Sequence, residues 1–232
     1  MGLGASSCRD NDDLIDKLVE GKLVTSKSVE LVDRSLFFPN DSKSFAYKDV
    51  AWKSVAGSPG HLHISAPCIY ANVLEHLELE KGLSFLNVGS GTGYLNTVVG
   101  FFLGSNGLNH GIELHPNIVE FARARVFDFL IRPEVQCYDW AIPSYSSGNG
   151  LMLHPIYNCK YDRVYCGASV PESHRESLWD LLKVGGVLVM PFDDQVIMML
   201  FALVVHFKYS FIFLLTRPNF ISHLKRMLLF VL

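Results

Sequence analysis

Short apolar runs typical of strands alternate with longer amphipathic runs typical of helices through most of the 232-residue chain. The strand-like runs cover residues 85–88, 111–113, 161–166 and 187–190. Helical spacing of apolar positions begins near Asn11, Pro67, Tyr94, Pro116 and Pro171, the last of these helices being expected over 171–182. Strands that alternate with helices indicate an α/β fold in which helices cover both faces of a parallel sheet.

Polar segments rich in glycine or proline separate these elements. We expect an irregular segment over residues 36–63, a polar loop over 143–150 and a turn over 183–186. Right-handed crossovers bring the carboxyl ends of parallel strands to one edge of the sheet, where ligands of such folds bind. The pattern therefore predicts a ligand site beside Gly89, Glu113 and Asn149.

Three glycines at alternate positions, Gly89, Gly91 and Gly93, join one of these strands to the helix that follows it. Glycine suits such a turn because it adopts positive φ and lets a ligand approach the backbone. The next strand ends in Glu113, and a carboxylate there can accept hydrogen bonds from both hydroxyls of a ribose. Together these features predict a nucleoside-containing cofactor.

The spacing of the glycines indicates which cofactor to expect. Dinucleotide sites have G-x-G-x-x-G, whereas this chain has G-x-G-x-G and no P-loop motif. The pattern is similar to the first motif of S-adenosylmethionine (AdoMet) methyltransferases. A plain strand-to-helix turn that binds no ligand is the alternative.

The composition fits one globular domain and disfavours several classes of protein. Apolar residues make up 49% of the chain and the net charge is −3, which indicates neither disorder nor nucleic-acid binding. The five cysteines are odd in number and lack C-x-x-C spacing, which favours a reducing compartment over disulfides or structural zinc. His110 and His115 are too scattered for a metal site, and residues 1–20 lack the apolar core of a secretory signal. We therefore expect a cytoplasmic protein that binds no metal.

The first six residues fit the N-myristoylation pattern M-G-x-x-x-[ST], with Gly2 as the acceptor. A chance match in a polar terminus is the alternative. A single myristoyl chain gives only marginal membrane binding, and no polybasic segment follows to strengthen it. The pattern predicts at most a weak association with membranes.

Several motifs together resemble the protein-L-isoaspartate O-methyltransferase family. The matching segments, in chain order, are residues 64–67, 86–93, 111–113, 148–150, 161–168 and 182–191. The I-S-A-P sequence at 64–67 is the specific one, because general methyltransferases lack it. The opening at 12–16, the segment 46–53 and the Met1-Gly2 terminus are most similar to the methyltransferase domain-containing subgroup. The resemblance implies a Rossmann-like class I AdoMet-dependent methyltransferase fold.

The resemblance also implies site residues, position by position. Ser65 matches the active-site serine of the family, and Gly89, Ser90, Gly91 and Gly93 would surround the methionine end of AdoMet. Glu113 would hold the ribose, where many members have Asp. Asn149 and Gly150 would flank the adenine, where the family usually has Asp-Gly. The remaining implied cofactor-binding residues are Ile64, Tyr70, Thr92, Leu114, Gly148 and Gln195.

The activity that the resemblance implies is methyl transfer from AdoMet to the carboxylate of isoaspartyl residues in damaged proteins, unless this chain has lost the transfer step. The alternative is a non-catalytic module that binds AdoMet and isoaspartate and delivers proteins to an elongin–cullin ubiquitin ligase, here truncated. For Ser65, an N-cap of the following helix is the structural alternative. Two departures bear on the choice: Cys68 and Tyr70 stand where the family commonly has histidines, and residues 53–63 differ from the loop that closes over substrate.

The resemblance stops near Gln195, so we divide the chain into three parts. Residues 1–60 form an N-terminal helical segment and substrate-side loop, 61–195 the methyltransferase-like domain, and 196–232 an apolar tail unlike the family. Three interpretations of the tail stay open: a membrane-embedded segment, a pair of edge strands that completes the sheet, or an altered C-terminus. Under the last, the strands that finish the family's sheet are missing or replaced.

Overall fold

A computed structural model describes residues 8–20, 31–54, 61–168, 170–192, 195–204 and 207–213. Gly2, the predicted myristoylation site, lies outside the described residues. For residues 195–204 and 207–213 the structure describes the course and pairing of the backbone.

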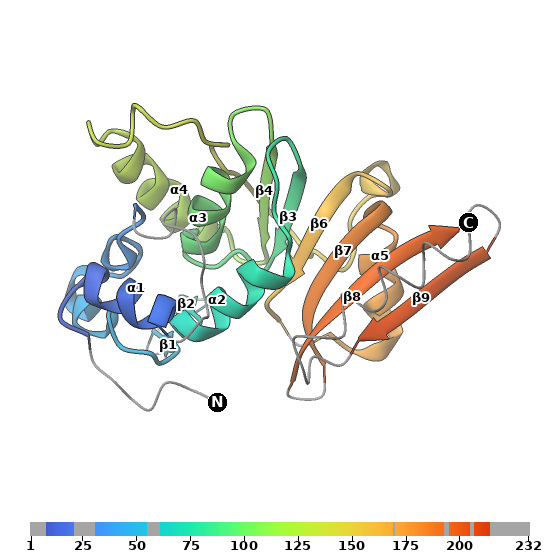
Figure 1. Cartoon of the computed structure of the whole chain (residues 1–232), viewed down its shortest axis with the longest axis horizontal. Coiled ribbons are helices and arrows are strands. Elements are labelled where there is room, and N and C mark those ends of the chain that lie inside the picture. The colour runs from blue at the N-terminus through green and yellow to red at the C-terminus, as the bar shows by residue number, and fades with distance from the viewer. Residues whose placement is uncertain are drawn as a thin grey trace.

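The centre of the fold is one seven-stranded sheet with the order β5-β4-β3-β6-β7-β8-β9 (Figure 1). Five strands pair in parallel, the four that the sequence predicts and β5, and β8 and β9 are antiparallel to their neighbours. The strands are β3 (Ser84–Val88), β4 (Leu108–Glu113), β5 (Ser144–Ser147), β6 (Tyr161–Cys166), β7 (Leu182–Phe192), β8 (Gln195–Val204) and β9 (Phe207–Phe213).

The predicted helices form, and most begin where the sequence indicates. Asp10 caps the first helix, because its side chain accepts a hydrogen bond from the Asp13 N–H at 2.9 Å. Proline in the first turn starts two others, where its fixed φ is favourable. The helices are α1 (Asn11–Glu20), α2 (Pro67–His76), α3 (Tyr94–Leu103), α4 (Pro116–Leu130) and α5 (Arg175–Trp179).

The segment expected to be irregular contains short elements that close one side of the molecule. Two 3₁₀ helices, η2 (Arg34–Phe37) and η3 (Asn40–Phe45), precede a small antiparallel pair, β1 (Trp52–Lys53) and β2 (His63–Ile64). Phe37, Phe38 and Ala46 from this segment are buried against α1, α2, α3 and α4 in one hydrophobic cluster. The N-terminal part therefore packs beside the helices that border the carboxyl edge of the sheet (Figure 1).

Alternate residues of the strands pack on opposite faces of the sheet, as expected for buried parallel strands. On one face Phe85, Tyr165 and Val189 pack against α2 and α3. On the other, Leu86 and Val164 pack in a cluster that includes Leu178 of α5. The two further 3₁₀ turns are η4 (Pro155–Tyr157), after β5, and η5 (Glu172–His174), before α5. Helices thus cover both faces, which confirms the predicted fold class.

Three local expectations are wrong. The polar loop over 143–150 contains a strand, β5, which pairs in parallel with β4 and buries only Tyr145. The turn at 183–186 lies inside β7, which runs on through a register irregularity opposite Tyr161 and Arg163. The helix expected over 171–182 is shorter, because η5 precedes α5 and β7 begins at Leu182.

The apolar stretch after Gln195 forms two antiparallel strands at one edge of the sheet. β8 pairs with β7, and β9 pairs with β8. Over residues 196–204 and 207–213 the backbone follows the interpretation as a pair of edge strands, and the rest of the tail lies outside the described residues. Within the described part of the chain, none of the helices has the length and apolar character needed to cross a membrane.

Candidate functional site

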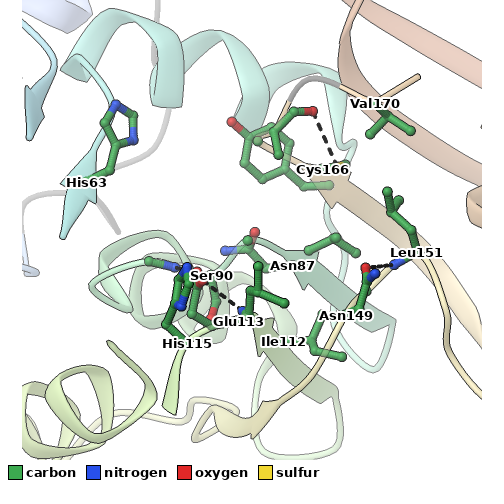
Figure 2. Close-up of a pocket in the computed structure, with 18 of the residues that line it drawn as sticks. His63, Asn87, Ser90, Ile112, Glu113, His115, Asn149, Leu151, Cys166 and Val170 are labelled. Carbon is green, nitrogen blue, oxygen red and sulfur yellow. Dashed lines mark hydrogen bonds between the residues drawn. The ribbon is translucent and has the colours of Figure 1, made fainter. Parts of the chain in front are cut away.

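A cavity of about 460 Å³ lies at the carboxyl ends of β3, β4 and β6, where the sequence predicts a ligand site. Its walls come from the Gly-rich turn after β3, the end of β4, the loop after β5, the end of β6 and the I-S-A-P segment before α2. Figure 2 shows Ser90 and Glu113 on one wall, Cys166 and Val170 on another, and His63 on a third. Segments about a hundred residues apart in sequence therefore meet at one cavity.

The Gly-rich turn needs its glycines for backbone conformation and for space. Gly89, Gly91 and Gly93 have φ of +78°, +54° and +88°. A Cβ on Gly91 would lie 2.9 Å from the carbonyl oxygen of His63, and a Cβ on Gly93 would lie 2.8 Å from the Tyr145 hydroxyl. Side chains at these positions would be strained and would close the turn against β2 and β5.

Glu113 ties the end of β4 to the Gly-rich turn. Its Oε2 accepts a hydrogen bond from the Gly91 N–H at 3.1 Å, and its Oε1 accepts one from the Leu114 N–H at 2.8 Å. Each carboxylate oxygen can accept further hydrogen bonds. The carboxylate can therefore hold ribose hydroxyls while it stays bonded to the turn.

Two buried polar atoms at the cavity have no hydrogen-bond partner among the described residues: Asn87 Oδ1 and Ser90 Oγ. The residues are 2% and 6% exposed, and both line the cavity. Asn87 is held from behind, because its Nδ2 donates to Asn96 Oδ1 at 2.8 Å and Asn96 in turn donates to Asn109 at 2.9 Å. Buried polar atoms without partners are costly, so this wall suits a polar ligand group.

The I-S-A-P segment presents Ser65 to the cavity with its backbone fixed. The Ser65 N–H donates to the Tyr70 hydroxyl at 3.1 Å, and the Ser65 carbonyl accepts from Arg34 Nη2 at 2.7 Å. Ser65 does not cap α2, because the N-cap position is Ala66 and it has no side-chain capping bond. Ser65 and Tyr70 both line the cavity, and the Ser65 hydroxyl is not engaged in a capping bond to α2.

The loop after β5 forms the remaining wall. Asn149 Oδ1 accepts a hydrogen bond from the Leu151 N–H at 3.0 Å, which fixes the loop (Figure 2). A Cβ on Gly150 would lie 2.5 Å from Val88 Cγ1, so only glycine fits there. Leu114, which also lines the cavity, is 57% exposed and offers an apolar surface for a flat ring.

The cavity collects ten of the residues expected at the site: Ser65, Tyr70, Gly89, Ser90, Gly91, Glu113, Leu114, Gly148, Asn149 and Gly150. Ile64, Thr92 and Gly93 do not line it: Ile64 and Thr92 are buried, at 0% and 2% exposure, and Gly93 is the N-cap of α3. Gln195 begins β8, and its side chain is not among those described.

Sequence reasoning missed several residues that line the cavity. They are His61, His63, Asn87, Val88, Ile112, His115, Leu151, Tyr165, Cys166, Gly167, Ala168 and Val170. The strand ends at Asn87 and Cys166 could have been found, because the predicted sheet places their carboxyl ends at the site. The histidines before I-S-A-P carry no comparable signal.

Two thiols and one histidine at or near the cavity have shifted pKa values. Burial raises the pKa of the Cys166 thiol to about 11, and burial together with a hydrogen bond to Asp49 raises that of Cys68 to about 11. Burial and the nearby Lys53 and Arg34 lower the pKa of His63. Neither thiol is activated as a nucleophile. Within the ranges described above, no cluster of side chains could hold a metal ion.

Comparison with known proteins gives a consistent result. The model of the family "Protein-L-isoaspartate(D-aspartate) O-methyltransferase (PCMT)" matches residues 9–204. "Protein-L-isoaspartate O-methyltransferase 1" of Arabidopsis thaliana is 33% identical over 192 residues, covering 80% of this chain and 79% of the relative. The protein-L-isoaspartate O-methyltransferase of Ignicoccus hospitalis is 30% identical over 164 residues, covering 71% of each chain. The family match therefore includes the N-terminal segment and β8.

Solved structures show the same fold. A protein-L-isoaspartate O-methyltransferase superposes with a TM-score of 0.70 at 24% identity, over 89% of this chain and 64% of the other. A Plasmodium falciparum structure described as a putative protein-L-isoaspartate O-methyltransferase, in complex with S-adenosyl-L-homocysteine, gives 0.66 at 21% identity, over 89% and 96%. At these identities the likeness concerns the fold.

Proposed function

We propose that this chain, which belongs to the protein-L-isoaspartate(D-aspartate) O-methyltransferase family, transfers a methyl group from AdoMet to the carboxylate of isoaspartyl residues in proteins. The observation that carries the proposal is the single cavity that joins Ser65 to the Gly-rich turn and Glu113. The family match covers every segment that contributes to this cavity.

AdoMet is the cofactor of this family, and the residues present fit it. The unpartnered Asn87 Oδ1 and Ser90 Oγ can bind the polar methionine end. Glu113 can hold the ribose, while Leu114, Asn149 and Gly150 offer the narrow, partly apolar wall that an adenine needs. Gly91 lets the turn approach β2 closely, because a Cβ there would collide with the backbone of His63.

The reaction requires little acid–base catalysis by the protein. When bound, AdoMet supplies a methyl group already activated by its sulfonium, and an isoaspartyl carboxylate is already a nucleophile at neutral pH. The protein has to hold the carboxylate oxygen in line with the S–CH₃ bond at about 3 Å. Ser65 can orient the carboxylate with its hydroxyl, because both backbone polar groups of Ser65 are already bonded. The neutral thiols and the absence of a strong base near Ser65, among the described residues, are therefore compatible with activity.

The alternative hypothesis, a recognition module of an elongin–cullin ubiquitin ligase, gains no support from these comparisons, which point to methyl transfer. Weak membrane association through Gly2 or the tail gains none either. Myristoylation of Gly2 and a cytoplasmic location stay predictions; mass spectrometry of the N-terminal peptide from cells tests the first.

The test is transfer of labelled methyl from AdoMet to a peptide with one isoaspartyl residue, with the aspartyl isomer as substrate control. We expect base-labile methylation of the isoaspartyl form alone. Ser65→Ala should lower the transfer rate at least about tenfold, since it loses the orienting hydroxyl. Ser147→Ala is the matched control, because Ser147 is exposed at the end of β5 and does not line the cavity. A folded wild-type chain that binds AdoMet and methylates neither peptide would contradict the proposal.

A further inference from the structure

Arg34 is a fully buried arginine next to the cavity, and the reaction described above gives it no role. Its exposure is 0%. Its Nε donates to the Ala46 carbonyl at 2.9 Å, and its Nη2 donates to the Ser65 carbonyl at 2.7 Å. Nη1 is buried and has no hydrogen-bond partner among the described residues. The guanidinium therefore touches the active-site segment directly and has donor capacity to spare.

Among the described residues, none forms an ion pair that would cancel the charge of Arg34. No carboxylate of a described residue lies within ion-pair distance of the guanidinium. Asp49 attracts the Arg34 guanidinium from farther away. The Asp49 carboxylate itself accepts a hydrogen bond from the Cys68 N–H at 3.0 Å. The close neighbours of the guanidinium carbon are the rings of Phe38, Tyr70 and Tyr94, with centroids 5.4, 5.8 and 5.4 Å away.

A buried cation without a carboxylate partner is unfavourable unless something compensates it. Carbonyl dipoles and aromatic faces do so in part. Burial lowers the pKa of Arg34, yet a guanidinium stays protonated in proteins, so the positive charge remains. Two of the residues that contact it, Ser65 and Tyr70, line the cavity. A carboxylate bound at Ser65 would therefore be separated from the positive charge of Arg34 by Ser65 alone.

We propose that Arg34 is a specificity-determining and positioning residue: it fixes the Ser65 peptide and makes the acceptor end of the cavity select an anionic carboxylate over a neutral group of the same shape. The inference rests on the proposed function, since it assigns the acceptor end of the same site. Arg34 acts through Ser65 and the local field and does not itself contact the reacting atoms.

The experiment compares binding of two peptides to the full chain loaded with S-adenosylhomocysteine, by fluorescence anisotropy. One peptide carries an isoaspartyl residue and the other its neutral amide, isoasparagine. We expect the wild type to bind the acid at least about tenfold more tightly. Arg34→Met keeps the aliphatic stem and loses the charge, and should reduce this preference to about twofold or less by weakening the acid more than the amide. Lys53→Met, which removes an exposed cation from β1, is the matched control and should leave the preference intact.

If the role of Arg34 is merely structural, Arg34→Met should weaken the binding of both peptides equally and leave the ratio of their affinities unchanged. That result would overturn the inference. If circular dichroism shows that Arg34→Met does not fold, the salt dependence of the wild-type preference tests the inference instead. A buried charge is poorly screened, so the preference should stay within about twofold between 0.05 and 0.5 M NaCl. A preference that disappears at the higher salt would assign it to exposed charges and overturn the inference. A wild type that binds S-adenosylhomocysteine and neither peptide contradicts the proposed function itself, and the inference falls with it.

Discussion

At the scale of single residues, Glu113 couples the shape of the Gly-rich turn to the ribose site. The same carboxylate that is expected to accept the ribose hydroxyls also accepts the Gly91 and Leu114 N–H groups. Hydrogen bonds to charged groups contribute about 1.5–3 kcal/mol each. The loss of this one side chain should therefore disturb both the cofactor and the turn that surrounds it.

Glu113→Ala should weaken AdoMet binding by about tenfold to a hundredfold, since at least one charge-assisted hydrogen bond to the ribose is lost. Isothermal titration of the folded variant measures the change. Glu120→Ala, at an exposed glutamate on α4 that does not line the cavity, is the control for loss of a negative charge and should bind as the wild type does. Equal affinity of Glu113→Ala and the wild type would rule out the ribose contact.

The sequence predicts the residues of the site that belong to short motifs, and it misses those that act across long separations. Gly89, Glu113 and Asn149 are predictable because strand ends of a parallel sheet converge. Arg34 is not, because its bond to Ser65 joins residues 31 apart that no periodicity relates. Asn87 is an intermediate case: its place near a strand end is predictable, whereas one amide within an apolar strand gives no sign that its oxygen lacks a partner.

At the scale of elements, β7 shows how a strand can run through an apparent turn. Gly185 has φ of +77° and lies where the register between β6 and β7 shifts. A Lys-Val-Gly-Gly sequence is typical of a turn, and only the pairing with β6 makes it a bulge within one strand. β5 was missed for a related reason: it is a polar edge strand with one buried residue, so neither alternation nor hydrophobicity marks it.

Gly185→Ala should lower the free energy of unfolding by about 1–2 kcal/mol, because an L-residue is disfavoured at this φ. A Cβ at Gly185 would meet nothing within 4 Å, so the cost comes from the backbone alone. Gly185→Asn should cost less, since asparagine tolerates the left-handed region better. Urea unfolding curves of the three proteins test the order, and an alanine variant as stable as the glycine protein would contradict it.

Asp162 links three strands of the sheet and makes their stability depend on pH. Its Oδ2 accepts from the Ser84 N–H at 2.8 Å, the Ser84 hydroxyl at 2.6 Å and Lys183 Nζ at 2.8 Å. Burial by itself would raise the pKa of Asp162, but hydrogen bonds from Lys183 and Ser84 outweigh it and lower the pKa. A lowered pKa in the folded state contributes stability above the unfolded pKa of about 3.9, and this contribution is lost as pH falls through the folded value.

We therefore expect Asp162→Asn to be less stable than the wild type by a constant amount above about pH 5, with the difference shrinking at lower pH. Urea unfolding at pH 7, 5, 4 and 3 measures it. Asp41→Asn, an exposed position in η3, is the comparison. A difference that grows on acidification would have the wrong sign for this explanation.

At the scale of the whole molecule, ligand binding at the cavity should stabilise the entire fold, because its walls come from most of the elements of the sheet. A ligand at one hundred times its Kd adds about 2.7 kcal/mol. For a domain of this size that corresponds to a rise in Tm of about 5–10 °C. Thermal unfolding with S-adenosylhomocysteine measures the shift.

Gly91→Val is the matching variant, since its side chain would occupy the turn against His63. It should show no such rise in Tm, while Gly82→Ala, at a positive φ with open space around it, should start from a lower Tm and still respond to the ligand. A wild type whose Tm is insensitive to the ligand would argue against cofactor binding at this cavity.

The cavity also constrains the order in which the protein can be completed during synthesis. Its wall includes His61 on one side and Val170 on the other, and β3 is tied to β6 by a bond between residues 78 apart. Contacts between residues so far apart in sequence form only after the intervening chain has closed into a loop, which costs conformational entropy. The chain must therefore have left the ribosome to beyond residue 170 before the cofactor can bind. Until then the Gly-rich turn lacks the other walls of its binding site.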